Sequence, residues 1–281
     1  MKTSTALSIL LATSTAVAAP SASGLVPSKG VSVYYEVHGT GDPLVLLHGG
    51  LTSLEVFGDN LTALAKHHQV IAIDLQGHGR TALGTRAMSL EAMADDVVAV
   101  LDKLKIKRAD IMGYSLGGEV TEAFATRYPK RAKRLVIVSA PFTRTGWHAE
   151  MTDGMDQITS AAAEPMKQSP LYTMFYAKLA PKVDEWPKLV GAVGDLLRKP
   201  FDFSASVPKF PPTLLVVGDA DGVQLAHMVE FFRLLGGGKT DAGWDGKARP
   251  ASQLAILPNH THYMIAVSPT LVQTVEPFLA R

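Results

Sequence analysis

The chain of 281 residues contains no cysteine. Disulfides, thiolate catalysis, cysteine zinc sites and lipid attachment through cysteine are therefore excluded. The chain also lacks a strong charge imbalance, since its formal net charge is +1, and its lysines and arginines form no basic stripe. We therefore expect no nucleic-acid partner.

The sequence also lacks an apolar run long enough for a convincing membrane span, so we expect no stable membrane anchor. Residues 6–19 form a short apolar stretch rich in Ala, Ser and Thr, after a positively charged start. Together with the small residues Ala16 and Ala18, this pattern is typical of a secretory signal peptide. The sequence predicts a leader over 1–18, cut after Ala18 or, as a second choice, after Ala22. The mature protein is expected to be secreted or periplasmic.

The composition is that of a globular chain with a sizeable core, since 47% of the residues are hydrophobic and 19% are charged. Apolar, β-branched segments alternate with helical ones, which indicates an α/β fold with a mostly parallel central sheet flanked by helices. Strands are expected at 31–38, 43–47, 70–75, 109–113, 134–139, 212–218 and 254–257. Helices are expected at 53–67, 90–104, 225–235 and 269–280, and Ser89 is the expected cap of the second.

The alternation breaks over 146–206, where helical stretches occur without a strand. Four of the ten methionines lie in this segment. We expect an inserted helical cap here, between core segments 24–145 and 207–281. It is predicted to lie over the carboxyl ends of the strands, where open α/β sheets bind ligands. Its methionines and aromatics suit either an apolar lid over a site or the core of a small helical subdomain.

Gly113-Tyr114-Ser115-Leu116-Gly117 is a G-x-S-x-G pentapeptide between a predicted strand and a predicted helix. Strand, sharp turn and helix in this order expose a serine hydroxyl at the end of a sheet. Glycines two positions either side fit the crowded turn. The amide of Leu116 and the positive end of the new helix would face an oxyanion formed at Ser115. The pentapeptide therefore predicts a nucleophilic serine.

From about residue 28 onward, the chain resembles the α/β-hydrolase fold family, in its serine-nucleophile, esterase- or lactonase-like branch with an inserted helical cap. The resemblance rests on the pentapeptide, on its extension to Gly118, and on four further motifs. These motifs are Leu47-His48-Gly49-Gly50, Asp74-Leu75-Gln76-Gly77-His78-Gly79-Arg80, Val217-Gly218-Asp219-Ala220-Asp221 and Leu257-Pro258-Asn259-His260-Thr261-His262-Tyr263. The order serine, aspartate, histidine along the chain is that of the family.

The resemblance implies a catalytic triad of Ser115, Asp221 and His262. The histidine of the family follows the last strand by a few residues, so His260 is the alternative to His262. Two aspartates follow the strand at 212–218, and Asp219 is the alternative to Asp221. A His-x-His pair also suits a metal, but no third ligand is evident, so we expect no metal site.

The resemblance further implies an oxyanion hole formed by the amides of Gly50 and Leu116, with Leu51 as the substitute for Gly50. We expect substrate contacts from side chains next to these motifs and from the insertion. The expected contact residues are Leu51, Tyr114, Phe142, Trp147, Met174 and Tyr263.

This set of residues implies acyl transfer to water through an acyl-enzyme, which needs no metal or organic cofactor. The leading interpretation is a carboxylic-ester hydrolase for small to medium apolar esters or lactones. Amidases, C–C bond hydrolases and perhydrolases use the same triad, so these activities stay open. A lipase and a ligand-binding protein on a hydrolase scaffold are further alternatives. The sequence leaves the oligomeric state undetermined.

Overall fold

The computed structural model describes residues 19–281. The predicted leader over 1–18, with its cleavage position after Ala18, lies outside the described residues. The second cleavage position falls inside a strand, because Ala22 is the first residue of β1 and pairs with Val37 of β2.

A single eight-stranded sheet runs through the middle of the described chain in the order β1-β2-β4-β3-β5-β6-β7-β8. Strand β2 is antiparallel to both of its neighbours, and the strands from β4 to β8 are parallel. The strands are β1 (Ala22–Ser28), β2 (Val31–His38), β3 (Asp42–Leu47), β4 (His68–Ile73), β5 (Ala109–Tyr114), β6 (Ala132–Val138), β7 (Thr213–Ala220) and β8 (Gln253–Thr261). The predicted mostly parallel sheet is confirmed.

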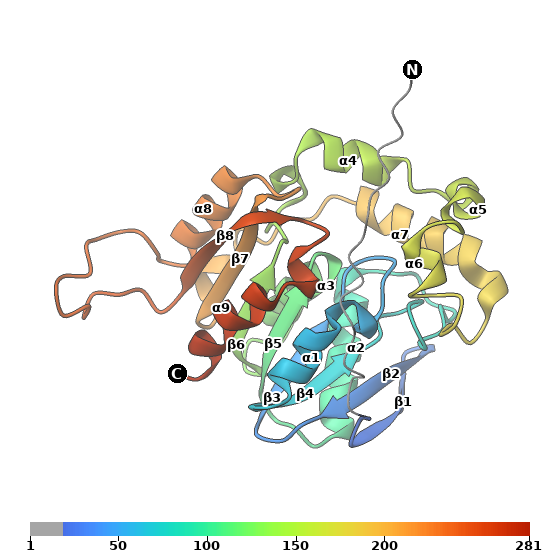
Figure 1. Ribbon diagram of the computed structural model, residues 1–281, viewed down its shortest axis with the longest axis horizontal. Coiled ribbons are helices and arrows are strands. Elements are labelled where there is room, and N and C mark those ends of the chain that lie inside the picture. The colour runs from blue at the N-terminus through green and yellow to red at the C-terminus, as the bar shows by residue number, and fades with distance from the viewer. Residues whose placement is uncertain (1–18) are drawn as a thin grey trace.

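Helices cover both faces of this sheet (Figure 1). On one face lie α1 (Asp59–Leu64) and α9 (Pro269–Leu279), and on the other α2 (Leu90–Lys103), α3 (Leu116–Arg127) and α8 (Leu225–Leu234). Strand β3 shows why both faces are covered. Its residues Leu44 and Leu46 join the apolar cluster beneath α1 and α9, whereas Val45 and Leu47 join the cluster beneath α2 and α3. Successive strand residues point to opposite faces, so an unbroken apolar strand needs a cover on each.

The largest differences between the elements predicted from the sequence and those of the structure occur in three places. Strand β1 was not predicted, because Gly24 and Pro27 interrupt its apolar pattern. The helix expected at 53–67 is a short 3-10 turn followed by α1, separated at Gly58, where φ is 47°. Strand β8 continues to Thr261, beyond the expected 254–257. The predicted cap of α2 is confirmed, since the Ser89 side chain accepts a hydrogen bond from the Ala92 amide at 3.1 Å.

Residues 146–206 contain helices and no strand, and all of them are described. The longer helices are α4 (Ala149–Asp156) and α7 (Trp186–Arg198), with the short α5 (Ala163–Met166) and α6 (Pro170–Thr173) between them. These helices gather at one end of the sheet, at the top of Figure 1. Helix α7 packs against α4 and α5, and its Leu189 and Val193 are buried in the main apolar cluster. The segment lies where a cap is predicted, and its exact boundaries stay a prediction.

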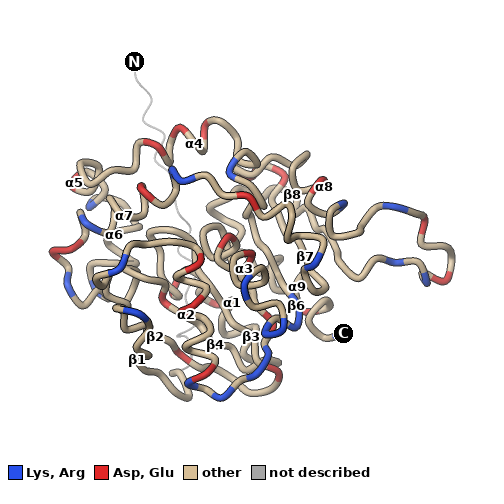
Figure 2. Tube along the Cα trace, turned by 180° about the vertical axis from the view of Figure 1, so that it is seen from behind, with Lys and Arg blue, Asp and Glu red and all other residues tan. Residues whose placement is uncertain are grey.

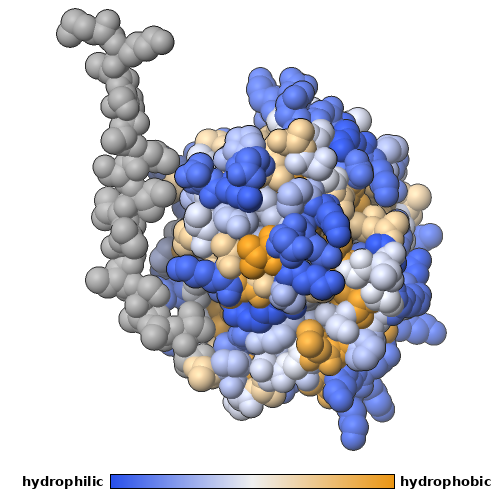
Figure 3. Space-filling view, turned by 90° about the vertical axis from the view of Figure 1, so that its right-hand side faces the viewer, coloured by the Kyte–Doolittle hydropathy of each residue, from blue (hydrophilic) through white to orange (hydrophobic). Residues whose placement is uncertain are grey.

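The surface carries charges of both signs side by side. Figure 2 shows Lys and Arg interspersed with Asp and Glu along the described chain. The side formed by α5 to α7 and the edge strands β1 and β2 is mainly hydrophilic, with small separate apolar areas (Figure 3). Within residues 19–281, every helix is too short or too polar to cross a bilayer.

Helix α3 buries the acidic side chain of Glu122 in the core. Within residues 19–281, neither carboxyl oxygen of Glu122 has a hydrogen-bond partner, and the side chain is fully buried. Burial, together with repulsion from Glu119 one turn away, raises the pKa of Glu122 well above its usual range. The folded protein therefore keeps a proton that the unfolded chain releases near pH 4.5, so the contribution of Glu122 to stability falls as the pH rises above that value.

Replacing Glu122 with the similarly sized methionine is therefore expected to stabilise the protein. We expect Glu122→Met to raise the free energy of unfolding by about 1–3 kcal/mol, and by more at pH 8 than at pH 5. Denaturant unfolding at both pH values measures the change. Glu230→Met, at an exposed position on α8, is the control and should change stability by less than about 0.5 kcal/mol. An equal effect at both pH values, or a less stable Glu122→Met protein, would contradict this prediction.

Candidate active site

Ser115 occupies a sharp turn between β5 and α3. Its backbone has φ 54° and ψ −120°, values that a residue with a side chain rarely adopts. The glycines on either side are required by close contacts. A Cβ on Gly113 would lie 2.0 Å from the Gly117 carbonyl oxygen, and one on Gly117 would lie 2.3 Å from the Leu47 carbonyl oxygen. The turn therefore holds the Ser115 hydroxyl at the carboxyl end of the sheet, as the pentapeptide predicts.

Three loops at this end of the sheet bring Ser115, His262 and Asp221 into one hydrogen-bonded line. The distance from His262 Nε2 to Ser115 Oγ is 3.1 Å, and the distance from His262 Nδ1 to Asp221 Oδ1 is 3.0 Å. His262 and Asp221 are both buried. This is the geometry in which an imidazole can take the proton of a hydroxyl while a carboxylate fixes its tautomer.

The carboxyl group of Asp221 is held by further hydrogen bonds. Oδ2 accepts from Ser139 Oγ at 2.5 Å and from the Gly218 amide at 3.3 Å, and Oδ1 accepts from the Val223 amide at 3.1 Å. Burial alone would raise the pKa of Asp221, but the hydrogen bonds from His262, Ser139 and Val223 outweigh it and hold the pKa below its usual range. Asp221 is therefore a carboxylate at neutral pH. Ser139 was not predicted to belong to the site.

The alternatives Asp219 and His260 lie next to each other and away from Ser115. The His260 amide donates to Asp219 Oδ1 at 3.2 Å. Both ring nitrogens of His260 are engaged, Nδ1 with the Pro258 carbonyl oxygen and Nε2 with Ser268 Oγ, each at 2.7 Å. Of the two aspartates and two histidines, only Asp221 and His262 are therefore hydrogen-bonded in line with Ser115.

The amides of Gly50 and Leu116 lie together beside Ser115. A Cβ on Gly50 would be 3.9 Å from the Cβ of Leu116, and neither amide donates to another group within the described chain. The substitute, Leu51, is already engaged, because its amide donates to His78 Nε2 at 2.9 Å. His78 can accept because burial lowers its pKa to about 4. Gly50 and Leu116 are therefore the amides available to an oxyanion.

Tyr114 fixes the loop that carries His262. Its hydroxyl donates to the His262 carbonyl oxygen at 2.8 Å, and the two rings lie 5.4 Å apart. The ring of Trp147 meets the imidazole edge-on at 5.3 Å from another side. The imidazole is thus held by packing as well as by its hydrogen bonds.

A cavity of about 320 Å³ opens in front of Ser115 and His262. Gly50 and Leu116 are among the residues that line it. Helices and loops of residues 146–206 supply its apolar walls, which are Met151, Met155, Ile158, Met166, Leu171, Val193 and Leu197. Three of the four methionines of the insertion, Met151, Met155 and Met166, thus face the cavity, as the lid interpretation expects. Val193 and Leu197 were not predicted, although the apolar spacing 189, 193, 197 along α7 could have indicated them.

Three of the six expected contact residues line this cavity, namely Leu51, Tyr114 and Tyr263. The other three lie elsewhere. Phe142 is buried in the core, stacked on His227 at 4.0 Å. Trp147 is behind the imidazole, and Met174 is 60% exposed on the outer surface of the insertion. Position in the sequence did not reveal which way these side chains turn.

Within residues 19–281, no three His, Asp or Glu side chains are grouped as a metal site would require. His48 and His78, the histidines nearest the oxyanion loop, both serve as hydrogen-bond braces. His48 Nε2 accepts from the Leu75 amide at 3.0 Å, and its Nδ1 donates to the Gly49 carbonyl oxygen at 2.7 Å. Their role is to hold the loop that presents Gly50.

Comparison with known proteins agrees with this architecture. A sequence model described as the alpha/beta hydrolase fold matches residues 42–161. The chain is 33% identical over 138 residues to 2-hydroxy-6-oxo-2,4-heptadienoate hydrolase of Pseudomonas putida, an alignment that covers 48% of this chain and 49% of the relative. The chain spans about half the length of the curated relatives it matches.

Solved structures match over a larger part of the chain. A thermophilic esterase from Thermogutta terrifontis superimposes with a TM-score of 0.71 at 20% identity, covering 92% of this chain and 98% of that one. The enol-lactonase from Burkholderia xenovorans LB400 gives 0.69 at 20% identity, covering 92% and 100%. These likenesses confirm the predicted fold. The chain therefore has the α/β-hydrolase fold, and the relatives named here are hydrolases.

Proposed function

We propose that the protein is a serine hydrolase of carboxylic esters, acting on small to medium apolar esters or lactones. The observation that carries this proposal is the hydrogen-bonded line from Ser115 through His262 to Asp221, which ends at an apolar cavity. On the strength of the predicted leader over 1–18, we assign the activity to the outside of the cytoplasm.

In the proposed reaction, His262 Nε2 takes the proton of Ser115 as the hydroxyl oxygen attacks the ester carbonyl. The amides of Gly50 and Leu116 donate to the resulting oxyanion, and each such donor is worth roughly 3 kcal/mol in the transition state. The imidazolium, stabilised by Asp221, then protonates the leaving alcohol. Water attacks the acyl-enzyme in the second half, with His262 again acting as the base.

The cavity favours neutral, compact substrates. Its volume of about 320 Å³ lies near the lower end of the usual range for ligand pockets, roughly 300–1,000 Å³. Apolar side chains form most of its wall. Glu150 also lines the cavity and is acidic. An apolar acyl group gains free energy by leaving water for such a wall. Short and medium acyl chains therefore fit this site best.

C–C bond hydrolysis is the second candidate, because the Pseudomonas putida relative is named as a hydrolase of 2-hydroxy-6-oxo-2,4-heptadienoate. A dienoate carries a carboxylate, which needs a cationic partner inside a cavity. Among the described residues that line this cavity, none is Lys or Arg, whereas Glu150 is present. The charge of the wall therefore favours neutral esters over this anionic substrate.

Hydrolysis of 4-nitrophenyl esters of increasing acyl length tests the proposal. We expect a burst of about one equivalent of 4-nitrophenol, because this activated ester should acylate the serine faster than water removes the acyl group. We expect kcat/KM to be highest for butyrate or hexanoate and to fall for palmitate, which the cavity cannot enclose. Mass spectrometry of the quenched reaction should locate the acyl group on the peptide containing Ser115.

A folded wild-type protein that hydrolyses none of these esters and forms no adduct would overturn the ester-hydrolase proposal. Turnover of the dienoate in that case would establish the second candidate. Activity on palmitate that rises steeply above its solubility limit would indicate a lipase instead.

A further inference from the structure

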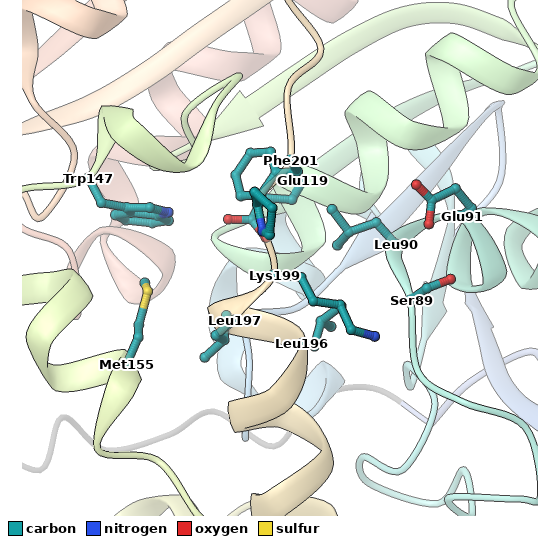
Figure 4. A pocket seen from close by; sticks show the side chains of 11 residues that line it. Ser89, Leu90, Glu91, Glu119, Trp147, Met155, Leu196, Leu197, Lys199 and Phe201 are labelled. Atoms are coloured by element: carbon teal, nitrogen blue, oxygen red, sulfur yellow. The ribbon is translucent and has the colours of Figure 1, made fainter.

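A second, smaller cavity of about 120 Å³ lies beside the active site (Figure 4). It is enclosed by the start of α2, by α3, and by the chain that follows α7. Its inner wall is mainly apolar or aromatic and includes Leu90, Trp147, Met155, Leu196 and Phe201. For comparison, an apolar cavity of about 150 Å³ accepts benzene. This cavity therefore has room for a group slightly smaller than benzene.

The second cavity adjoins the catalytic one. Met155 and Leu197 line both cavities and so form a shared wall of flexible side chains. Trp147 lines the second cavity and also packs edge-on against the imidazole of His262 at 5.3 Å. A molecule in the second cavity would thus be separated from the reacting serine by one layer of side chains.

The buried polar group of this cavity is the carboxyl of Glu119. This residue lies one helical turn after Ser115 and is 3% exposed. The indole N–H of Trp147 hydrogen-bonds to it, and Figure 4 shows the nitrogen end of the indole turned toward Glu119. Burial, partly offset by this bond and by the charge of Arg144, raises the pKa of Glu119 to about 8. Burying an acid is costly, so one that faces a cavity is a candidate for function.

No cationic side chain of the described residues forms an ion pair with Glu119. Arg144 pairs instead with Asp156 at 2.7 Å. Lys199 also lines the cavity, but it is an exposed residue whose Nζ is directed to the Met88 carbonyl oxygen at 3.4 Å. The other acid, Glu91, is exposed as well. The interior of the cavity thus holds one carboxyl group without a cation.

We propose that this cavity binds a small alkylammonium group, with the Glu119 carboxylate as its counter-ion and Trp147 and Phe201 as aromatic walls. An ammonium ion would supply the missing charge, and its alkyl part would contact the apolar wall. Aromatic faces attract cations, most strongly where water is excluded. The bound cation would stabilise the ionised form of Glu119, whose proton leaves to solvent.

The alkylammonium group that binds in this cavity could come from two kinds of molecule. One is a free alkylammonium ion. The other is the amino end of an ester whose carbonyl is held at Ser115 and whose chain passes between Met155 and Leu197. This second source rests on the proposed ester hydrolysis, whereas the first does not.

Binding of propylammonium chloride, compared with the isosteric neutral propanol, tests the site directly. We expect an NMR titration of the wild-type protein to show saturable binding of propylammonium only. Glu119→Gln should weaken binding about tenfold or more, as expected for the loss of a bond between charged groups. Glu230→Gln, outside both cavities, is the control and should leave Kd unchanged. Equal binding of propanol, or unchanged binding in Glu119→Gln, would overturn the proposal. If Glu119→Gln does not fold, the comparison of propylammonium with propanol on the wild-type protein still tests the proposal.

The two sources are separated by kinetics on 4-nitrophenyl 6-aminohexanoate and the uncharged heptanoate. A wild-type preference for the amino ester that is lost in Glu119→Gln and kept in Glu230→Gln identifies the substrate as the source. Propylammonium binding without such a preference identifies a free ligand. If neither binding nor preference occurs, the cation site is overturned, and turnover of the heptanoate would still support the ester-hydrolase proposal.

Discussion

Ser115→Ala and His262→Ala are each expected to lower kcat for a 4-nitrophenyl ester about 10⁶-fold. The two side chains act as one unit, because the hydroxyl is a poor nucleophile unless the imidazole at 3.1 Å takes its proton. The double variant should therefore be no slower than either single variant. Steady-state kinetics, with circular dichroism to verify folding, measures the effect.

His260→Ala is the matched control for this prediction. His260 lies two residues from His262, but its ring is bonded to Ser268 and Pro258 rather than to Ser115. We expect its kcat to stay within about tenfold of wild type. A variant lacking His260 that is as inactive as one lacking His262 would contradict the assignment of the base.

Asp221→Asn is expected to lower kcat about 10⁴-fold with little change in structure. An amide in place of the carboxylate no longer stabilises the imidazolium that forms during the reaction, and it favours the wrong tautomer of His262. Asp221 is well suited to this role, because hydrogen bonds hold its pKa below the usual range despite burial. The rate constants of single-turnover acylation measure the loss at the chemical step.

Asp219→Asn serves as the control for the second prediction. Asp219 is exposed and accepts a hydrogen bond from the His260 amide. We expect a change of less than about tenfold in the acylation rate, since an asparagine oxygen can still accept this bond. A loss in Asp219→Asn equal to that in Asp221→Asn would show that the wrong aspartate has been assigned.

Much of the fold could be predicted from local patterns. Strands such as β3 and β5 are short apolar runs bounded by turn residues, and α2 has an apolar stripe and a serine cap. These signals depend on neighbours along the chain. Strand β1 gave no such signal, because it contains glycine and proline and is stabilised by pairing with β2 at the sheet edge.

The expected substrate-contact residues show what local sequence patterns cannot predict. Phe142 and Met174 are apolar residues in or near the insertion, yet one is buried in the core and the other is exposed to solvent. The direction of a side chain in irregular structure depends on packing with distant elements, and the sequence does not display that packing. Glu119 was missed for the same reason, because a glutamate on a predicted helix is ordinarily expected to face water.

The sequence by itself identified Ser115 as the candidate nucleophile and determined the order of the elements around it. The turn at Ser115 needs glycines at fixed spacing, and this requirement is local and therefore visible in the chain. The family resemblance favoured Asp221 and His262, but only the tertiary structure shows which aspartate and which histidine are hydrogen-bonded in line with Ser115. Members of each pair have the same side chain and are two residues apart at the end of one strand, so the residues themselves do not show which member reaches Ser115. Their distances to Ser115 depend on how β7 and β8 lie beside β5 and β6, which long-range packing alone fixes.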